Sequence, residues 1–348
     1  MSAGTNLSLS LLLPTLNGGP DLDHLLTALA GQVDEIIIAD SESADDTPAI
    51  ARKHGAKVIT IPRVGFSHSG TRNILGDAAR GELLLFMTQD ALPSSDHWLA
   101  DLRAKLQKNP RIAAVSCAQL PRPDADLFAR ITGFHHRRFM QIEQHDRILR
   151  KPIRKTYEHW RRNSELADSA CLIRKSIWQK YHFQREFGED IDLGLRLIRD
   201  GHHLALMRSA AIIHSHNRSP IYQAKRAYVS TKLLLDLFPD CPVPRVTEQT
   251  LQRDILPVWE AIQQSQTPSY AQNETLAPLM AHMRRMAETW KQHEPHDQFT
   301  AQDWAEFEQK ALASRVGLCL AAFPILQGGS GAERDSLRQL DAQLRSGV

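Results

Sequence analysis

Short apolar segments alternate with amphipathic segments along the first hundred residues. The apolar segments are short enough to be β-strands and cover residues 7–13, 33–39, 57–61 and 82–87. Each is followed by a helical pattern, at residues 22–30, 47–54, 69–79 and 97–106. Strands that are separated by helices usually pair in parallel, because the helix carries the chain back across the sheet. We therefore predict an α/β fold, with a mainly parallel sheet flanked by helices.

The composition changes near residue 240. A Cys-Pro-Val-Pro segment at 241–244 resembles a domain boundary, and helical patterns such as 276–291 and 301–320 follow it. We predict a first domain of residues 1–240 and an α-helical C-terminal extension of residues 241–348. The extension carries no recognisable chemistry, and packing, dimerisation and membrane attachment remain open as its role. Residues 328–331, Gly-Gly-Ser-Gly, are predicted to form a flexible link.

Charge and cysteine content narrow the choice of compartment and partner. The chain has 42 basic and 40 acidic residues, so its net charge of +2 gives no argument for nucleic acid as a partner. The four cysteines lie far apart, which argues against a zinc knuckle and a disulfide framework. Residues 1–6 lack the basic region of a signal peptide. We expect a cytoplasmic protein.

Polar residues follow the predicted strands where a parallel sheet binds its ligands. The chain has Pro-Thr-Leu-Asn at 14–17, Asp-Ser-Glu-Ser at 40–43 and Thr-Gln-Asp at 88–90. Asp40 could accept the imide N–H of uracil or thymine, and Ser41 or Ser43 could contact ribose. No glycine-rich dinucleotide loop or P-loop is present.

Two acidic sites, Asp90 and the adjacent pair Glu189 and Asp190, each have a structural and a chemical interpretation. Asp90 follows an apolar strand, where a buried carboxylate is costly unless it is paired or bound to a metal. Glu189 and Asp190 follow Gly188 at the start of a predicted helix, where acidic side chains also stabilise the helix dipole. Both positions are candidates for chemistry because they accompany the polar strand ends described above.

Several motifs together resemble a known family. They are residues 66–73 (Phe-Ser-His-Ser-Gly-Thr-Arg-Asn), 86–93 (Phe-Met-Thr-Gln-Asp-Ala-Leu-Pro), 187–196 and 213–217 (Ile-His-Ser-His-Asn). Over residues 7–236 the chain resembles family 2 inverting glycosyltransferases of the GT-A fold, and is most similar to their bacterial rhamnosyltransferase branch.

This resemblance implies a role for each motif. Pro14, Thr15 and Asp40 would hold the nucleotide, with Arg72 beside it at the diphosphate. The full set of candidate nucleotide-binding residues is Pro14, Thr15, Asn17, Asp40, Ser41, Ser43, Arg72 and Gln89. Asp90 would bind a divalent metal, Mg²⁺ or Mn²⁺. Asp190 would be the catalytic base, supported by Glu189, and Arg196 would face the diphosphate.

The chain departs from the family pattern at two positions. Thr88 stands where relatives have a second acidic metal ligand, which leaves Asp90 as the acidic ligand of the motif. His214 or His216 could complete the metal site, although both could also be a polar strand end. Asn17 replaces a glutamate that many relatives have, and it can still form hydrogen bonds there.

Two further segments have open interpretations. Residues 147–162 contain seven Lys or Arg and one acidic residue, interleaved with apolar ones. The segment is either a solvated face or a surface for anionic lipid headgroups or for the diphosphate of a lipid-linked acceptor. Residues 168–171 are interpreted as a loop that could admit an acceptor sugar.

We therefore expect transfer of L-rhamnose from dTDP-L-rhamnose to a cell-surface polysaccharide or lipid-linked glycan at the cytoplasmic face of the membrane. The alternatives are a UDP- or GDP-sugar donor with the same mechanism, and a non-catalytic nucleotide- or glycan-binding scaffold. A nucleotidylyltransferase is disfavoured because residues 14–21 lack its glycine-rich basic loop. Nucleic acid is not an expected partner.

Overall fold

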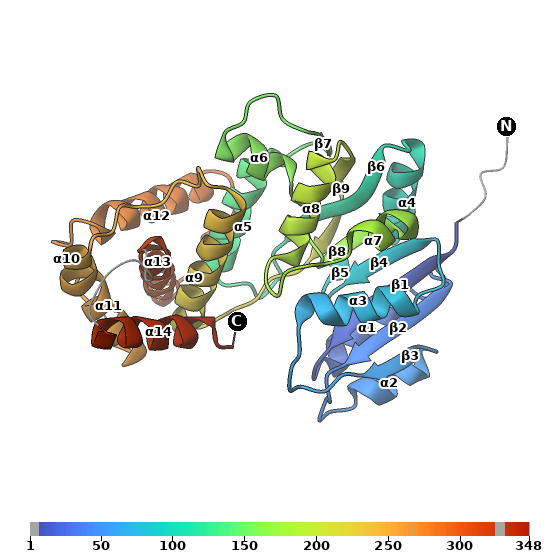
Figure 1. Ribbon diagram of the computed structural model, residues 1–348, viewed down its shortest axis with the longest axis horizontal. Helices are drawn as coiled ribbons and strands as arrows, with labels where there is room; N and C mark the ends of the chain where they lie inside the picture. Colours follow the sequence, from blue (N-terminus) through green and yellow to red (C-terminus); the bar gives the residue numbers. More distant parts are fainter. Residues whose placement is uncertain (1–6, 267, 324–330, 348) are drawn as a thin grey trace. The chain divides into compact units, whose positions relative to one another are not determined.

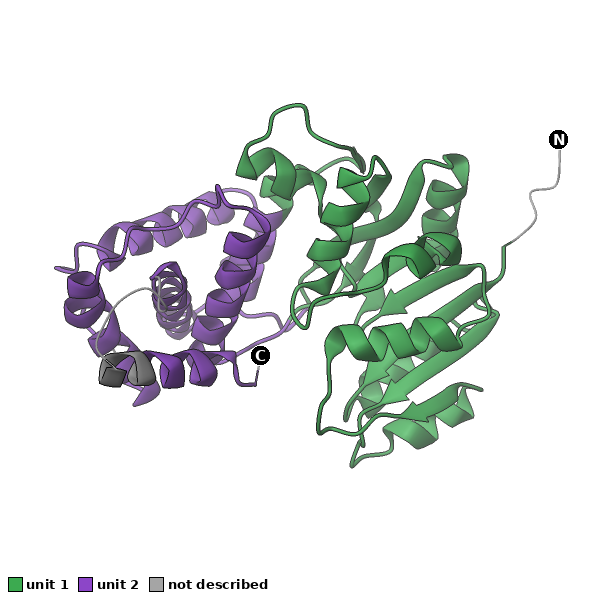
Figure 2. Ribbon diagram, viewed as in Figure 1, with its two compact units in different colours: residues 1–122, 137–215 green, residues 123–136, 216–348 purple. Residues whose placement is uncertain are grey.

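The computed structural model describes residues 7–266, 268–323 and 331–347. Figure 2 shows two compact units: residues 1–122 and 137–215 form the first, and residues 123–136 and 216–348 form the second. This division falls at 215/216 and places the inserted segment 123–136 with the C-terminal helices. Composition alone had indicated a boundary at 240/241, and the assignment of 1–240 as one catalytic domain stays a prediction.

The first unit is built on a nine-stranded sheet with the order β3-β2-β1-β4-β8-β6-β9-β5, in which β7 also pairs with β9. The strands are β1 (Leu9–Thr15), β2 (Glu35–Asp40), β3 (Lys57–Thr60), β4 (Leu83–Met87), β5 (Leu92–Pro93), β6 (Ile112–Leu120), β7 (Arg147–Leu149), β8 (Ala170–Arg174) and β9 (His203–Ile213). Strands β5, β7 and β8 run opposite to the other strands. The predicted mainly parallel α/β sheet is confirmed.

Helices cover both faces of this sheet (Figure 1). They are α1 (Gly19–Ala28), α2 (Thr47–Lys53), α3 (His68–Ala78), α4 (Trp98–Lys108), α6 (Tyr157–Asn163), α7 (Lys175–Tyr181) and α8 (Glu189–Arg199). Leu11 of β1 packs in the apolar layer under α1, α2 and α4, whereas Leu12 packs in the layer under α3, α7 and α8. Every strand and helix predicted within residues 7–106 is present.

Local sequence explains where the helices of the site begin. The Ser67 hydroxyl accepts a hydrogen bond from the Gly70 N–H and caps α3. Gly188, immediately before α8, adopts a left-handed conformation (φ 65°) that glycine reaches more easily than other residues. Gly194 lets α8 approach the end of α6, because a Cβ there would lie 2.3 Å from the Ser164 carbonyl oxygen. These features fix the position of α8 and of its acidic first turn.

The described part of the second unit is helical. Its elements are α5 (Leu127–Phe139, whose last three residues belong to the first unit), α9 (Pro220–Leu237), α10 (Glu248–Thr250), the π-helix η1 (Leu251–Ile255), α11 (Leu256–Gln263), α12 (Leu276–Lys291), α13 (Ala301–Ala322) and α14 (Gly331–Arg345). Helices α9 and α13 meet closely, because a Cβ at Gly317 would lie 2.0 Å from the Ala224 carbonyl oxygen. The predicted helices at 276–291 and 301–320 are confirmed, and most of the predicted link at 328–331 lies outside the described residues.

No helix among the described residues is long and apolar enough to cross a membrane.

Candidate active site

The ends of β1 and β2 bring three predicted nucleotide-binding residues together. Thr15 and Asp40 are partners in the parallel register, and the Thr15 hydroxyl donates to Asp40 Oδ1 at 3.2 Å. The Ser43 hydroxyl donates to the same oxygen at 2.6 Å, and its N–H donates to Asp40 Oδ2 at 3.0 Å. Asp40 is buried. The Asp40 carboxylate therefore organises the loop after β2.

The remaining candidates in these loops hold the loops to each other. The Asn17 N–H donates to the Ser43 hydroxyl at 2.9 Å, and Asn17 Oδ1 accepts from the Ala44 N–H at 2.8 Å. The Ser41 N–H donates to the Thr15 carbonyl at 2.9 Å. Pro14 is partly exposed at the end of β1. The two loops form one connected rim at the carboxyl edge of the sheet.

Gln89 links this rim to the end of β4. Its side-chain oxygen accepts from the Leu16 N–H at 2.9 Å, and its amide nitrogen donates to the Leu16 carbonyl at 3.1 Å. The Gln89 side chain lies directly over Gly18, where a Cβ would be 2.2 Å from Gln89 Cδ. Gln89 thus fixes the backbone after β1.

Strand pairing carries the other candidate residues to the same edge. Met87 at the end of β4 pairs with Ala170 at the start of the antiparallel β8, and the Thr88 N–H donates to the Ser169 carbonyl at 3.4 Å. Asp90 and Asp168 lie just beyond these positions, at the same edge of the sheet. The interpretation of residues 168–171 as a loop is wrong in its second half, because Ala170 and Cys171 belong to β8.

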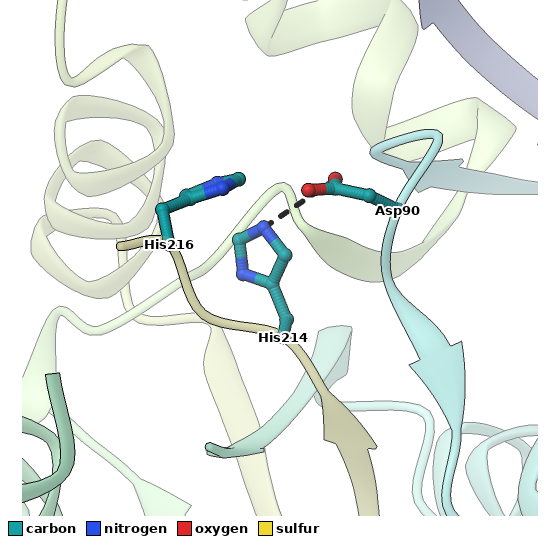
Figure 3. Close-up of side chains that lie close together, drawn as sticks. All are labelled: Asp90, His214 and His216. Carbon is teal, nitrogen blue, oxygen red and sulfur yellow. Dashed lines mark ion pairs between the residues drawn. The ribbon is translucent and has the colours of Figure 1, made fainter. Parts of the chain in front are cut away.

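Asp90 faces His214, which follows β9 directly (Figure 3). The His214 Nε2 atom lies 3.5 Å from Asp90 Oδ1, and both side chains are mostly buried. Asp90, His214 and His216 each offer a ligand atom, and these atoms lie within 4.8 Å of one another. The His214–Asp90 pair lies within the first unit, and His216 is the first residue after it.

The donor set of this cluster fits a divalent metal that accepts nitrogen as well as oxygen ligands. The His214 Nδ1 atom lies 2.8 Å from Gln119 Oε1, at the end of β6. If Nδ1 carries the proton, it donates to Gln119 and leaves the Nε2 lone pair directed towards Asp90. A hydrogen bond from the ring nitrogen that does not bind the metal commonly orients a metal-binding histidine.

The base motif is joined to α3 by a buried arginine. Arg72 Nη1 donates to Glu189 Oε1 at 3.0 Å, and Arg72 Nε lies 2.9 Å from Asp168 Oδ2. The exposed fractions of these side chains are only 4% for Arg72, 7% for Glu189 and 17% for Asp168. Arg72 was predicted to lie at the nucleotide diphosphate, and its observed partners are the carboxylates beside Asp190.

Glu189 and Asp190 differ in accessibility although they are adjacent. Glu189 is buried, whereas Asp190 is partly exposed. Asp190 Oδ1 accepts from the Ile191 N–H at 2.7 Å, and Oδ2 accepts from the Asp168 N–H at 3.4 Å. These two hydrogen bonds fix the orientation of the Asp190 carboxylate at the start of α8.

Burial and negative neighbours change the proton affinity of both carboxylates. Burial is the largest cause that raises the pKa of Glu189, the charge of Asp168 adds to it, and Arg72 offsets only part. Burial also raises the pKa of Asp190, followed by the charges of Asp168 and Glu165. A carboxylate with a raised pKa is a stronger base than an ordinary one, which is the property a general base needs.

Arg196 is held by partners on α8 and at the end of α7. Its guanidinium donates to Asp192 at 2.7 Å and to the carbonyls of Tyr181 and His182 at 2.6 and 2.7 Å. These contacts tie α8 to the C-terminal end of α7. The structure gives Arg196 a structural role, and its predicted position at the diphosphate stays a prediction.

Three residues of the site were missed by sequence reasoning. Asp168 contacts Arg72 from 96 positions away, and Gln119 contacts His214 from 95 positions away, so neither has a local signal. Glu165 forms a buried pair with Arg161 in and after α6. Its spacing of four residues from Arg161 is the one signal that the sequence contained.

A model of the family described as Glycosyl transferase family 2 matches residues 10–180. This segment, just under half of the chain, is a domain of that family. It is 28% identical over 230 residues to the O-antigen chain rhamnosyltransferase WbaN of Salmonella anatum, covering 64% of this chain and 70% of that protein. It is 26% identical over 231 residues to the O-antigen chain rhamnosyltransferase RfbN of Salmonella typhimurium, covering 64% and 71%.

A solved structure of this fold is also similar to the chain. The mannosyltransferase PcManGT of Pyrobaculum calidifontis, in complex with GDP-Man and Mn²⁺, superimposes with a TM-score of 0.55 at 15% sequence identity, covering 90% of this chain and 87% of that one. The predicted resemblance to family 2 glycosyltransferases, its greater similarity to rhamnosyltransferases and the GT-A fold are confirmed. The candidate residues of this chain other than Arg196 follow or contact the strand ends at one edge of the sheet.

Proposed function

We propose that this glycosyltransferase transfers L-rhamnose from dTDP-L-rhamnose to a growing cell-surface polysaccharide or lipid-linked glycan, with inversion at the anomeric carbon. The observation that carries the reaction type is the partly exposed Asp190, held beside the buried Arg72–Glu189 pair at the ligand-binding edge of the sheet. The names of the two similar O-antigen rhamnosyltransferases support the sugar and the kind of acceptor.

The rim formed by the loops after β1 and β2 would bind the nucleotide. Asp40 would accept the imide N–H of thymine, and Ser41 or Ser43 would contact the ribose. The hydrogen bonds among Thr15, Asp40 and Ser43 hold the rim in place before a ligand arrives. Such preorganisation reduces the entropy lost on binding.

Asp190 would act as the general base in a single displacement. It would accept the proton of the acceptor hydroxyl while that oxygen bonds to the anomeric carbon of rhamnose. The bond between that carbon and the diphosphate oxygen breaks, and its electron pair leaves with dTDP. Arg72, Glu189 and Asp168 would be positioning residues, because their contacts fix the first turn of α8 and raise or limit the proton affinity of Asp190.

Asp90 and His214 would hold a divalent metal, Mn²⁺ or Mg²⁺, and His216 is near enough to take part. Such an ion, when bound, offsets negative charge on the diphosphate as a Lewis acid. Gln119 would keep the His214 ring in the orientation that presents Nε2.

Nucleotide-dependent stabilisation and turnover together test this proposal. With Mn²⁺ present, dTDP should raise the melting temperature more than UDP or GDP, because a ligand that binds the folded state stabilises it. The Asp190→Asn variant should keep the dTDP-induced shift and lose turnover by about 10²–10⁴-fold, the usual effect of a general base. The exposed Asp96→Asn serves as a matched control that should leave turnover unchanged.

The other outcomes separate the alternatives. A larger increase in melting temperature with UDP or GDP than with dTDP would indicate a UDP- or GDP-sugar donor with the same mechanism. Full activity of Asp190→Asn would refute its role as the base. Nucleotide binding without any turnover in the wild-type protein would favour the non-catalytic scaffold.

A further inference from the structure

The connection between β7 and α6 exposes an isoleucine among positive charges. We define the basic loop as residues 150–156; Figure 1 shows it projecting from the first unit between β7 and α6. Ile153 is 98% exposed. Its neighbours include four exposed basic residues, Arg150, Lys151, Arg154 and Lys155, and the loop contains no acidic residue. An aliphatic side chain presented in this way adds nothing to the core.

The positive charge of the basic loop is not neutralised by the helix that follows it. Glu158, the acidic residue of α6, forms an ion pair with Arg162 at 2.6 Å. Lys151 donates to the Arg199 carbonyl at 3.0 Å, which anchors the base of the loop to α8. The acceptor is an uncharged carbonyl, so this contact leaves the charge of the loop unchanged. An apolar tip surrounded by cations matches the chemistry of an anionic bilayer, where headgroups attract the cations and the interfacial region accepts the apolar side chain.

The basic loop is physically connected to the candidate base. It leads into α6, whose seven residues span about 10 Å. The end of α6 packs on α8 at Gly194, and Glu165 just after it is one of the charges that raise the pKa of Asp190. A surface bound through the basic loop would thus lie near the start of α6, with Asp190 near its other end.

We propose that the basic loop docks this glycosyltransferase on an anionic phospholipid bilayer, with Ile153 inserted and the side chains of Arg150, Arg154 and Lys155 on lipid headgroups. Such docking would also bring a membrane-held acceptor towards Asp190, and this part of the inference rests on the proposed function. The docking itself does not, because it requires neither donor nor acceptor.

Vesicle co-sedimentation of the full chain tests the docking. Vesicles of phosphatidylcholine with about a quarter phosphatidylglycerol should bind the protein, and binding should weaken in high salt. Vesicles of phosphatidylcholine alone should bind it far less. Ile153→Asp should weaken binding by about tenfold, and the Arg154→Gln/Lys155→Gln variant by about 25-fold, at about fivefold for each charge.

Val64 provides a matched control. It is 94% exposed in a different loop, and the neighbouring Arg63 is already bonded to the carbonyls of Ser41 and Glu42. Val64→Asp should therefore bind vesicles as the wild-type protein does. All of these variants should keep the melting temperature and the dTDP-induced shift of the wild type, because the altered side chains are exposed.

Several results would overturn the docking. They are equal binding to neutral vesicles, equal losses for Ile153→Asp and Val64→Asp, and no binding to either vesicle. Displacement by soluble pyrophosphate at constant ionic strength would instead assign the loop to a diphosphate group, and capture of an acidic protein without vesicle binding would assign it to a protein partner. Asp190→Asn should still bind vesicles fully, so failure of the catalytic proposal and failure of the docking are distinguishable.

Discussion

Replacing Arg72 by methionine should destabilise this protein far more than replacing a surface arginine with the same ion-pair distance. Methionine keeps much of the length of the side chain and removes the guanidinium that lies 2.9 Å from Asp168 and 3.0 Å from Glu189. Arg80 is the matched comparison, because its Nε lies 3.0 Å from Glu35 Oε1 while its side chain is 87% exposed.

Burial determines the expected size of each effect. Removing one partner of a buried ion pair leaves an uncompensated charge and costs about 3–5 kcal/mol of unfolding free energy. For Arg72 the stranded groups are Asp168 and Glu189, although protonation of Glu189, whose pKa is already raised, relieves part of the cost. Glu35 is itself only 12% exposed, but it keeps its hydrogen bonds from the Ser10 hydroxyl and the Arg80 backbone N–H when the Arg80 side chain is changed. Arg80→Met removes only the contact of an exposed guanidinium and should therefore cost little, about 0–1 kcal/mol.

Urea unfolding at neutral pH measures both variants against the wild type. Arg72→Met should lower the midpoint strongly at an unchanged slope, and the loss should shrink at lower pH as the stranded carboxyl groups gain protons. The urea midpoint of Arg72→Lys should lie between those of the wild type and Arg72→Met, since one ammonium cannot occupy the positions of two guanidinium nitrogens. Equal midpoints for Arg72→Met and Arg80→Met would refute the reasoning that this network is buried and strongly coupled.

The sequence predicted the parts of the site that lie next to strand ends. Thr15, Asp40 and Asp90 could be found because apolar strands precede them, and the carboxyl ends of parallel strands share one edge. The contacts of Arg72 could not be found in the same way. Its partners come from the segment before the antiparallel strand β8 and from α8, and no periodic pattern encodes which distant elements meet.

Arg196 shows the opposite limitation. Its position one helical turn after Asp192 was visible in the sequence, but the family resemblance directed it to the diphosphate. In the structure its remaining nitrogens meet the carbonyls that end α7. Helix ends leave carbonyls without partners, and a nearby arginine is a common solution that no short motif announces.

Three other changes test the geometry around α8. Gly194→Ala should lower the unfolding free energy by about 1–3 kcal/mol in urea titrations because its Cβ meets backbone, whereas Gly70→Ala, with neighbours at 3.4 Å, should be neutral or stabilising. Because folding raises the pKa of Glu189 above its ordinary value of about 4.3, the folded state holds a proton that the unfolded state loses. The free energy of unfolding should therefore fall as the pH rises from the ordinary pKa of Glu189 through its raised pKa. In Glu189→Gln, the urea midpoint should depend less on pH over this range. Asp168→Asn removes a charge that raises the pKa of Asp190, so the acid limb of the turnover profile should move to lower pH; an unmoved limb would count against Asp190 as the base.

The charge balance of the buried cluster supports the proposal that Asp190, and not Glu189, exchanges a proton with an acceptor. The cluster contains more carboxylates than guanidiniums: Glu165, Asp168, Glu189 and Asp190 against Arg72 and Arg161. Protons are therefore bound more tightly there than by isolated carboxylates. Arg161 contacts Glu165, and Arg72 contacts Asp168 and Glu189, so that within the described residues no arginine ion pair holds the carboxylate of Asp190. Asp190 could therefore take up a proton without breaking a buried ion pair, as the proposed role of a general base requires.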